Sequence, residues 1–377
     1  MQIVISVGGK FHAYHTARAA QRAGCLKRFI TTVYDETEAG IDHTRVTELR
    51  LPDWLGRALR RVPGSGGVVP WNWVKDNLFD LMATQHLPDC DIFHVWNNYG
   101  LFSLRKAKQL GSKVIVERGS AHPLTQQRLL REEHARWGLR FPGTNHGLLK
   151  KQLRELAEAD YIYVPSAFAR LSMVQEGIPA DKLIEIPYGA ELATFRPMAR
   201  PDDVFRILFV GTVSLRKGIP YLLEAARTLD LPQSELLLVG RVDEDIKTIL
   251  GQHAGGFRAI GPVPHQKLPA HYARSSLFVL PSIEEGSALV TYEAMASGLP
   301  LVVTTNTGSI VRDGVDGFVV PIRDADALAE KILFFYENEE ARREMGKAAR
   351  EYARQFTWER YGEQVIAAYR RILDSAR

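Results

Sequence analysis

The sequence predicts an α/β protein made of two Rossmann-like domains that face each other across a deep cleft. The chain has 377 residues, which is the length of about two domains. Apolar strand-like runs alternate with helix-like runs, a pattern typical of parallel sheets covered by helices. The alternation is interrupted at 197–203, a stretch rich in Pro, Arg and Asp, and then begins again. We therefore expect an N-terminal domain at 1–197 and a C-terminal domain at 198–358.

The N-terminal half begins with an apolar run that is typical of a buried first strand rather than a secretion signal. Strands are expected at 1–7, 91–95, 113–117 and 161–164, and helices at 13–23 and 148–159. Residues 51–73 follow neither pattern and contain several Pro and Gly residues. They predict a loop or a mobile lid.

The C-terminal half repeats the alternation. Strands are expected at 205–210, 235–239, 277–280 and 301–303, and helices at 220–228, 268–274, 289–296, 327–337 and 340–355. Proline is favourable in a first helical turn, and Pro220 and Pro269 stand there. Open sheets of this kind bind ligands beyond the carboxyl ends of their strands, so the residues that follow each strand are the candidates for a site.

Composition excludes several classes of protein. Hydrophobic residues make up 45% of the chain and charged residues 24%, values typical of globular proteins and not of disordered or fibrous ones. Cys25 and Cys90 are too few for a disulfide framework or a four-cysteine zinc site, which suits a reducing cytoplasm. No apolar run reaches the roughly 18 residues of a membrane-spanning helix.

The net charge of +4 is unevenly spread. Residues 1–200 carry 27 Lys and Arg against 20 Asp and Glu, and the rest carry 21 against 24. A basic N-terminal half favours an anionic partner or a membrane surface; scatter in composition explains it equally well. We expect no nucleic-acid partner.

The richest motif occupies residues 281–300, where a strand runs into a helix. Gly286 and Ser287 would leave backbone N–H groups at the helix start, where the dipole favours a diphosphate. Glu285 and Glu293 are eight residues apart, or about 12 Å along a helix axis. The nearer carboxylate could hold sugar hydroxyls and the deeper one a ribose diol. Alternatively, Glu285 is only a dipole feature, whereas Glu293 in an apolar helix needs a partner or a ligand.

Three further strand ends carry candidate residues. Arg216 and Lys217 are adjacent cations that would stabilise a leaving nucleoside diphosphate, or else a solvated loop pair. Gly8 and Gly9 permit close approach of the backbone to a ligand, although the GxGxxG fingerprint is absent. His122 could face the transferred group, but a lone histidine is more often structural.

No cluster has the spacing of a strong metal site. Asp243 and Asp245 follow a strand end and are the one plausible ligand pair. An acidic first helical turn explains them as well. We expect no catalytic metal and no cofactor.

Together these pieces resemble the family 4 retaining glycosyltransferases (glycosyl transferases group 1), which have the GT-B fold. The resemblance is carried by Glu285 and Glu293 with the run 293–300, by Arg216-Lys217-Gly218, by 186–191 and by 313–318. It covers nearly the whole chain and is strongest over 187–317. It implies two domains across a cleft, with a C-terminal helix at about 359–377 that packs back on the N-terminal domain.

The resemblance also implies roles for individual residues. Glu293 would bind the nucleotide ribose, Glu285 the donor sugar or phosphate, and Lys217 with a nearby arginine the diphosphate. The remaining donor contacts would come from the backbone of Ser287, Ala288 and Leu289, from the Gly8-Gly9 loop, and from 260–263, where Val263 would line the base.

The sequence departs from the family pattern at several positions. Thr212 stands where arginine is frequent, Ser287 where an aromatic residue is common, and Tyr188 where asparagine is frequent. The usual histidine at the strand end is not cleanly present, because His122 lies a little downstream. We therefore assign the role of the family's cleft histidine to His122, although its position does not match the family motif directly.

The expected function is glycosyl transfer with retention, from a UDP- or GDP-sugar to a hydroxyl on a glycan or lipid-linked glycan, in polysaccharide or glycolipid biosynthesis. One alternative is a disaccharide or sugar-phosphate synthase with a small acceptor, and another is a nucleotide-sugar-binding protein without turnover. An NAD-dependent oxidoreductase is disfavoured because the glycine fingerprint is missing.

The acceptor-binding region is predicted from residues 51–73, which combine tryptophan and arginine: Trp54, Arg57, Arg60, Arg61, Trp71 and Trp73. Such a loop suits a membrane interface or a lipid-phosphate acceptor. Stacking on sugars or proteins, or packing in the core, is the alternative. We expect a cytoplasmic protein, with peripheral contact at the inner face of the cytoplasmic membrane through this loop.

Overall fold

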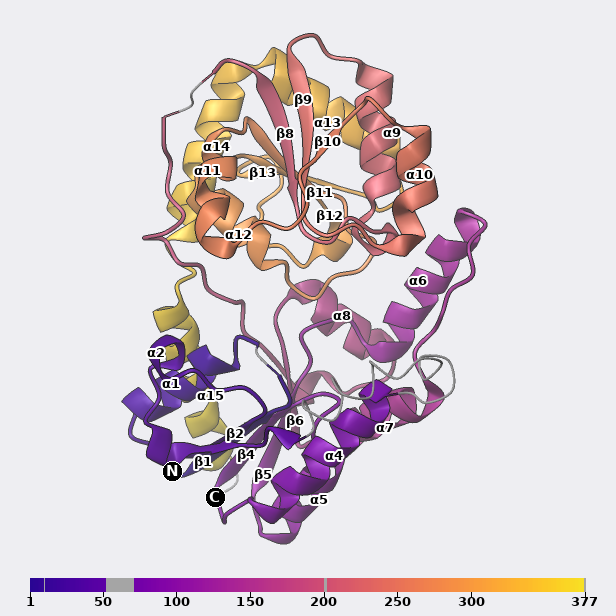
Figure 1. The fold of residues 1–377 in the computed structure, drawn as a ribbon. Coiled ribbons are helices and arrows are strands. Elements are labelled where there is room, and N and C mark those ends of the chain that lie inside the picture. The colour runs from indigo at the N-terminus through magenta and orange to yellow at the C-terminus, as the bar shows by residue number, and fades with distance from the viewer. Residues whose placement is uncertain (10, 52–70, 200–201, 376–377) are drawn as a thin grey trace.

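The structure is a computed structural model that describes residues 1–9, 11–51, 71–199 and 202–375. Two parallel sheets lie one above the other, and helices cover both (Figure 1). The first sheet comprises β1 (Ile3–Val7), β2 (Leu26–Thr31), β3 (Val46–Glu48), β4 (Ile92–Trp96), β5 (Lys113–Glu117), β6 (Tyr161–Val164) and β7 (Leu183–Glu185). Its helices are α1 (Ala13–Arg22), α2 (Glu36–Ala39), α4 (Trp71–Gln85), α5 (Leu101–Gln109), α6 (Pro123–Arg136), α7 (His146–Glu158) and α8 (Ala167–Gln175).

The second sheet lies above the first in Figure 1. It comprises β8 (Phe205–Val210), β9 (Ser234–Val239), β10 (Arg258–Ala259), β11 (Leu277–Leu280), β12 (Leu301–Thr304) and β13 (Gly317–Val320). Its helices are α9 (Ile219–Leu229), α10 (Lys247–Gln252), α11 (Leu268–Ala273), α12 (Leu289–Ala296), α13 (Ala325–Glu337) and α14 (Glu339–Ala353). The long helix α15 (Trp358–Asp374) then returns to the first sheet.

The order of the strands fixes where a ligand can bind. The strand order of the first sheet is β3-β2-β1-β4-β5-β6-β7, and that of the second is β10-β9-β8-β11-β12-β13. In each sheet the strand order therefore reverses direction once. The change falls between β1 and β4 in the first sheet and between β8 and β11 in the second. Ligands of doubly wound sheets bind at this switch point, which is where the glycine loops and the 281–288 loop begin.

The two segments that connect the domains run side by side. The backbone N–H of Ala190 donates to the carbonyl of Phe356 over 2.9 Å, so the outgoing segment pairs with the returning one. Beyond it, α15 packs against α1, where the hydroxyls of Thr16 and Tyr361 are 2.9 Å apart. The aromatic face of α15 thereby joins the buried core of the first sheet.

One expectation about the N-terminal half is wrong at residues 71–73. The expected loop or lid at 51–73 lies mostly outside the described residues, but Trp71 and Trp73 begin helix α4. Tertiary bonds anchor this helix: the buried carboxylate of Asp80 accepts from the backbone of Ser103 at 3.0 Å and from the ammonium of Lys151 at 2.9 Å. Such distant partners leave no trace in the local sequence pattern.

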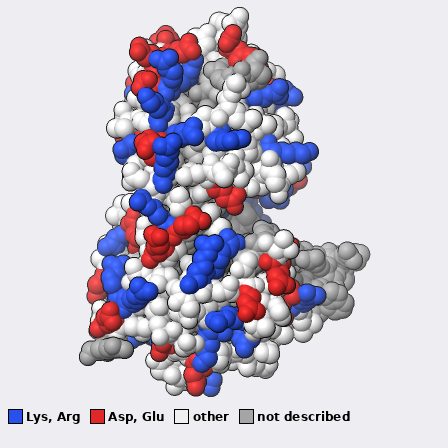
Figure 2. Space-filling model, turned by 90° about the vertical axis from the view of Figure 1, so that its left-hand side faces the viewer, with Lys and Arg blue, Asp and Glu red and all other residues white. Residues whose placement is uncertain are grey.

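Charged side chains are mixed in sign over both domains on the face shown in Figure 2. The positive excess of the first half is therefore not gathered into one patch on this face. No helix among the described residues is long and apolar enough to cross a membrane.

Candidate functional site

Two loops of the second sheet meet at its switch point. The loop after β8 ends in Gly218, whose φ of +68° favours glycine. A Cβ atom on Gly218 would also lie 1.9 Å from the carbonyl oxygen of Pro281, in the loop after β11. The backbone N–H of Ile283 donates to the carbonyl of Arg216 over 2.9 Å. The glycine therefore lets the cationic loop dock on the acidic one.

This docking brings together three residues that the sequence predicted. The guanidinium Nη2 of Arg216 lies 3.5 Å from Glu285 Oε1, and the ammonium of Lys217 forms an ion pair with Glu285. The neighbouring Glu284, which the sequence analysis missed, lies 2.9 Å from Arg216 Nε. The site thus holds two cations and two carboxylates within two short loops.

Lys217 is the most perturbed cation of the site. Burial and the charge of Arg216 lower the pKa of its ammonium to about 7, and Glu284 opposes this shift in part. A cation that is costly to bury becomes more stable when an anion approaches. The arrangement is therefore suited to an anionic ligand such as a diphosphate.

Glu293 lies on α12 and is nearly buried. Its Oε2 accepts from the hydroxyl of Tyr272 and its Oε1 pairs with Nε2 of His265, each over 2.9 Å. The hydrogen bond with Glu293 is the main cause of the raised pKa of His265. The buried charge thus has the partners that it needs, and the sequence analysis identified neither of them. Their signal would have been a tyrosine and a histidine on the preceding segment at 265–272.

The start of α12 is left open to a ligand. Ala288 stands at the N-cap and makes no side-chain hydrogen bond to the first turn, and Leu289 begins the helix. Ser287 instead pairs its hydroxyl with that of Tyr292 at 3.1 Å. Among the described residues, no side chain accepts from the backbone N–H groups of Ser287, Ala288 and Leu289, as an anion site requires, whereas the N–H of Gly286 donates to Glu285 Oε1 over 3.4 Å.

Residues 193–352 match the family model described as glycosyl transferases group 1. This match covers less than half of the chain and shows that its second domain is similar to the glycosyl transferases group 1 domain. The domain contains the second sheet and with it Arg216, Lys217, Glu285 and Glu293. The first sheet lies outside the matched residues. The comparisons that follow extend over more of the chain.

One curated relative of the chain is the O-antigen chain mannosyltransferase B of Escherichia coli, 33% identical over 244 residues, or 59% of this chain and 64% of that protein. The chain spans about half the length of most curated relatives it matches. Sucrose-phosphate synthase from Thermosynechococcus elongatus has a similar structure, with a TM-score of 0.75, 22% identity and full coverage of both chains. Anabaena HepE, solved in complex with UDP-glucose, has a TM-score of 0.67 and 15% identity, and the match covers 98% of this chain and 99% of that one. These likenesses show the fold, and the GT-B arrangement expected from the sequence is confirmed.

Opposite the glycosyl transferases group 1 domain, the loop after β5 supplies the facing contact. A Cβ atom on Gly286 would lie 1.8 Å from the carbonyl oxygen of Gly119. The hydroxyl of Ser166 also donates to the carbonyl of Gly286 over 2.5 Å. The two domains therefore touch, backbone to backbone, next to Glu285.

His122 has the contacts of a helix cap. Its Nδ1 accepts from the backbone of Leu124 over 3.4 Å at the start of α6, and its own N–H donates to Ser172 over 2.8 Å. Burial lowers the pKa of the imidazole to about 4. These hydrogen bonds of His122 stay within the first domain, and among the described residues none joins it to Arg216 or Glu285. The buried residue at the strand end is instead Arg118, which donates to Asn97 and Gln126.

The other predicted donor contacts are spread over both domains. A Cβ atom on Gly8 would lie 2.3 Å from the ring of Tyr99, and one on Gly9 would lie 3.0 Å from the ring of Phe11. Aromatic packing thus explains glycine at position 8 without a ligand. Val263 lies half-buried against the core of the glycosyl transferases group 1 domain.

Beneath the first switch point lies a buried acid–base cluster that the sequence analysis missed. Glu117 forms an ion pair with His12, and its Oε2 lies 3.2 Å from Nε2 of His94. Burial raises the pKa of Glu117, but the two histidines outweigh it and lower the pKa to about 2. His94 in turn bonds to the hydroxyl of Tyr369 on α15 over 2.7 Å. The cluster thereby ties the returning helix to the sheet.

Asp243 and Asp245 have protein partners in the structure. Asp243 lies 2.7 Å from Nη2 of Arg241, and Asp245 lies 3.8 Å from Nε2 of His134. Within the described part of the chain, no group of three or more His, Cys, Asp or Glu residues is arranged to hold a metal ion. The absence of a catalytic metal stays a prediction.

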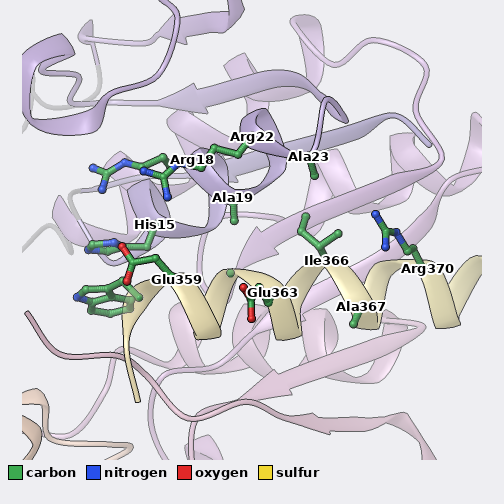
Figure 3. A pocket seen from close by; sticks show the side chains of 12 residues that line it. His15, Arg18, Ala19, Arg22, Ala23, Glu359, Glu363, Ile366, Ala367 and Arg370 are labelled. Atoms are coloured by element: carbon green, nitrogen blue, oxygen red, sulfur yellow. The ribbon is translucent and has the colours of Figure 1, made fainter. Parts of the chain in front are cut away.

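A cavity of about 450 Å³ lies away from this site, between α1 and α15 (Figure 3). The ring of His15 stacks on Trp358 at 3.7 Å, while Arg18, Arg22 and Arg370 lie along its walls. None of the sequence-predicted site residues lines it. It belongs to the packing of the returning helix rather than to the cleft between the domains.

Proposed function

We propose that this protein is a family 4 retaining glycosyltransferase that moves a sugar from a UDP- or GDP-sugar to an acceptor hydroxyl. The observation that carries the proposal is the placement of Arg216 and Lys217 against Glu285, at the switch point of a glycosyl transferases group 1 domain. The open start of α12 beside them adds backbone donors for the same diphosphate.

Each residue has a role in this proposal. Glu293, held by Tyr272 and His265, accepts from the ribose hydroxyls, and Val263 lines the base. Lys217 and Arg216 neutralise the diphosphate, and Glu285 contacts the donor sugar. Gly8 and Gly9 approach the phosphate from the first domain when the donor is bound.

In the proposed reaction the acceptor oxygen bonds to the anomeric carbon as the bond from that carbon to the diphosphate breaks. Attack comes from the face that the leaving group vacates, and a phosphate oxygen takes the acceptor proton. The chain's own residues then act by positioning and by stabilising the charge of the leaving group. Contact between the domains at Gly119 and Gly286 helps to exclude water, which would otherwise hydrolyse the donor.

The nucleotide sugar is a proposal supported by a structural neighbour, because Anabaena HepE was solved with UDP-glucose. A glycan acceptor is supported by the similarity to an O-antigen chain mannosyltransferase. We therefore propose a glycan or lipid-linked glycan acceptor in polysaccharide or glycolipid biosynthesis. We also propose a cytoplasmic location and peripheral membrane contact near α4, where the side chain of Trp73 is 37% exposed.

Calorimetric titration with UDP, GDP, ADP and NAD tests the donor site. We expect UDP or GDP to bind selectively, and Glu293→Ala to lose this binding because the ribose contact is gone. Glu340→Ala, on the exposed face of α14, is the matched control and should bind like wild type. If wild type binds none of these nucleotides, or binds NAD alone, the proposed function is wrong.

Turnover is tested separately, because a nucleotide-sugar-binding protein would pass the titration. We expect slow hydrolysis of the preferred nucleotide sugar, abolished by Lys217→Ala. Exposed Lys267 provides the control Lys267→Ala, which should hydrolyse normally. Nucleotide binding with no hydrolysis and no transfer to any acceptor would identify a binding protein instead. A product made only with free sugars or sugar phosphates would identify a small-acceptor synthase.

A further inference from the structure

Glu284 is a fully buried carboxylate that joins the two domains. It lies in the loop after β11, and its Oε1 accepts from the hydroxyl of Ser120 over 2.7 Å and from the backbone N–H of Ala121 over 3.1 Å. Its Oε2 accepts from the side-chain amide of Gln126 over 2.9 Å. All three donors belong to the first domain, so the carboxylate of one domain accepts its hydrogen bonds from the other domain.

The same carboxylate holds Arg216 of its own domain. Arg216 Nε lies 2.9 Å from Glu284 Oε2 and 3.1 Å from the Glu284 carbonyl oxygen. Nη2 of Arg216 reaches Ser120 over 3.4 Å. A guanidinium is planar, so bonds to one edge set the direction of its remaining donors. Among the described residues Nη1 of Arg216 donates no hydrogen bond, and the side chain is 37% exposed.

The charge balance shows why Glu284 depends on both domains. Burial raises the pKa of this carboxyl, but Arg216 and the bonds from Ser120, Gln126 and Ala121 lower it overall. A buried charge without partners is costly. Separation of the domains would remove three of the hydrogen bonds and expose the carboxylate to water, which would weaken its hold on Arg216.

We propose that Glu284 is a positioning residue that couples contact between the domains to the orientation of Arg216 for the donor diphosphate. This inference rests on the proposed function, in which Arg216 binds the diphosphate. Glu284 itself touches no part of the donor. It acts by fixing the Nε edge of Arg216, so that Nη1 is directed as a donor only when the loop 119–121 is docked.

A second buried carboxylate offers a matched control. Glu133 on α6 is also fully buried between the domains, and it accepts from Tyr221 over 2.9 Å and pairs with Arg323 over 2.8 Å. Within the described part of the chain, no hydrogen bond or ion pair joins Glu133 to Arg216. Glu133→Gln and Glu284→Gln therefore remove the same charge from the same kind of interdomain contact, and only the second one changes the partner of Arg216.

The test compares nucleoside diphosphate with nucleoside monophosphate, because only the former carries the second phosphate. We would measure by calorimetry the dissociation constants of UDP and UMP, or of GDP and GMP if wild type prefers guanosine. Glu284→Gln should weaken diphosphate binding by about tenfold, the loss of one charge-assisted hydrogen bond. Monophosphate binding should stay within about twofold, and Glu133→Gln should leave the ratio of the two constants unchanged.

Ser120→Ala keeps the test usable if Glu284→Gln does not fold. It removes one bond from the first-domain side and should shift the same ratio by about two- to fivefold. An unchanged ratio in both variants, or an equal change in Glu133→Gln, would overturn the inference while leaving the proposed function intact. Absence of diphosphate binding by wild type would instead overturn the proposed function.

Discussion

Gly119 and Gly286 come from opposite domains and are in backbone contact. A Cβ atom on Gly286 would lie 1.8 Å from the carbonyl oxygen of Gly119 and 2.7 Å from the Cα of Ser120. Neither neighbour is the flexible end of a side chain, so neither can move aside cheaply. The closeness of the two domains at the candidate site is thus set by the absence of one methyl group.

Gly286→Ala should hold the domains apart. We expect at least about a hundredfold loss of transfer, because small misplacements of reacting groups cost this much, and a larger radius of gyration in small-angle scattering. The control is Gly251→Ala on α10, where no atom lies within 4 Å of the added methyl group. Normal transfer by Gly286→Ala would mean that the contact at Gly119 is not needed.

The lowered pKa of Lys217, about 7, predicts how nucleotide binding depends on pH. Above pH 7 the free ammonium loses its proton, and a bound diphosphate favours the charged form. Affinity for UDP or GDP should therefore be greatest below pH 7 and fall by up to about tenfold per pH unit above it. Binding at pH 7.5 should also take up protons, which calorimetry in buffers of different ionisation enthalpy detects.

Lys217→Arg separates this effect from the titration of other groups. A guanidinium stays charged across this range, so the affinity of the variant should be flat between pH 7 and 9. A wild-type profile that is equally flat, or a variant that keeps the wild-type slope, would assign the pH dependence to another residue.

Tyr272→Phe should weaken nucleotide binding without changing the charge of the site. The variant loses the hydroxyl that holds Glu293 Oε2 at 2.9 Å, so the carboxylate is less well placed for the ribose. We expect about a fivefold higher dissociation constant, the value of one hydrogen bond. The control is Tyr336→Phe, which loses a hydroxyl that donates to the carbonyl of Pro232, and it should bind normally.

Arg323→Ala should destabilise the protein, because Arg323 holds helix α6 against the second domain. Arg323 donates to Glu133 and to the carbonyl of Leu129, and it reaches Glu132 at 3.1 Å. Its loss leaves Glu133 buried with fewer donors, which should lower the free energy of unfolding by about 1–3 kcal/mol. Urea unfolding measures this. Arg343→Ala, on an exposed side chain, should change stability by less than about 0.5 kcal/mol.

Removal of divalent cations by a chelator should leave the rate of glycosyl transfer unchanged. The charge of the leaving diphosphate would be balanced by Arg216 and Lys217 rather than by a divalent cation. Initial rates with and without EDTA, after removal of bound ions, should agree within error. A loss that magnesium or manganese restores would contradict this prediction and would reopen the assignment of Asp243 and Asp245.

Local pattern was enough to identify most elements of the second sheet. The expected strands at 205–210 and 277–280 and the helix at 289–296 coincide with β8, β11 and α12. These segments are apolar runs bounded by Gly or Pro, and burial on both faces makes such runs continuous. Strand β2 and helices α4 to α6 were missed or misassigned, because their charged residues mask the pattern. Asp80 and Glu133, for example, are buried by partners far away in the chain.

The sequence by itself predicted the two alternating halves, and it placed Arg216, Lys217, Glu285 and Glu293 at strand ends and helix starts of the second half. Each of these depends on spacing within a strand–loop–helix unit, which is local. The tertiary structure alone decided that Glu284 joins the domains, and that Tyr272 and His265 hold Glu293. A buried polar atom takes whichever partner the packing of distant segments brings within about 3 Å, and no local spacing encodes that choice.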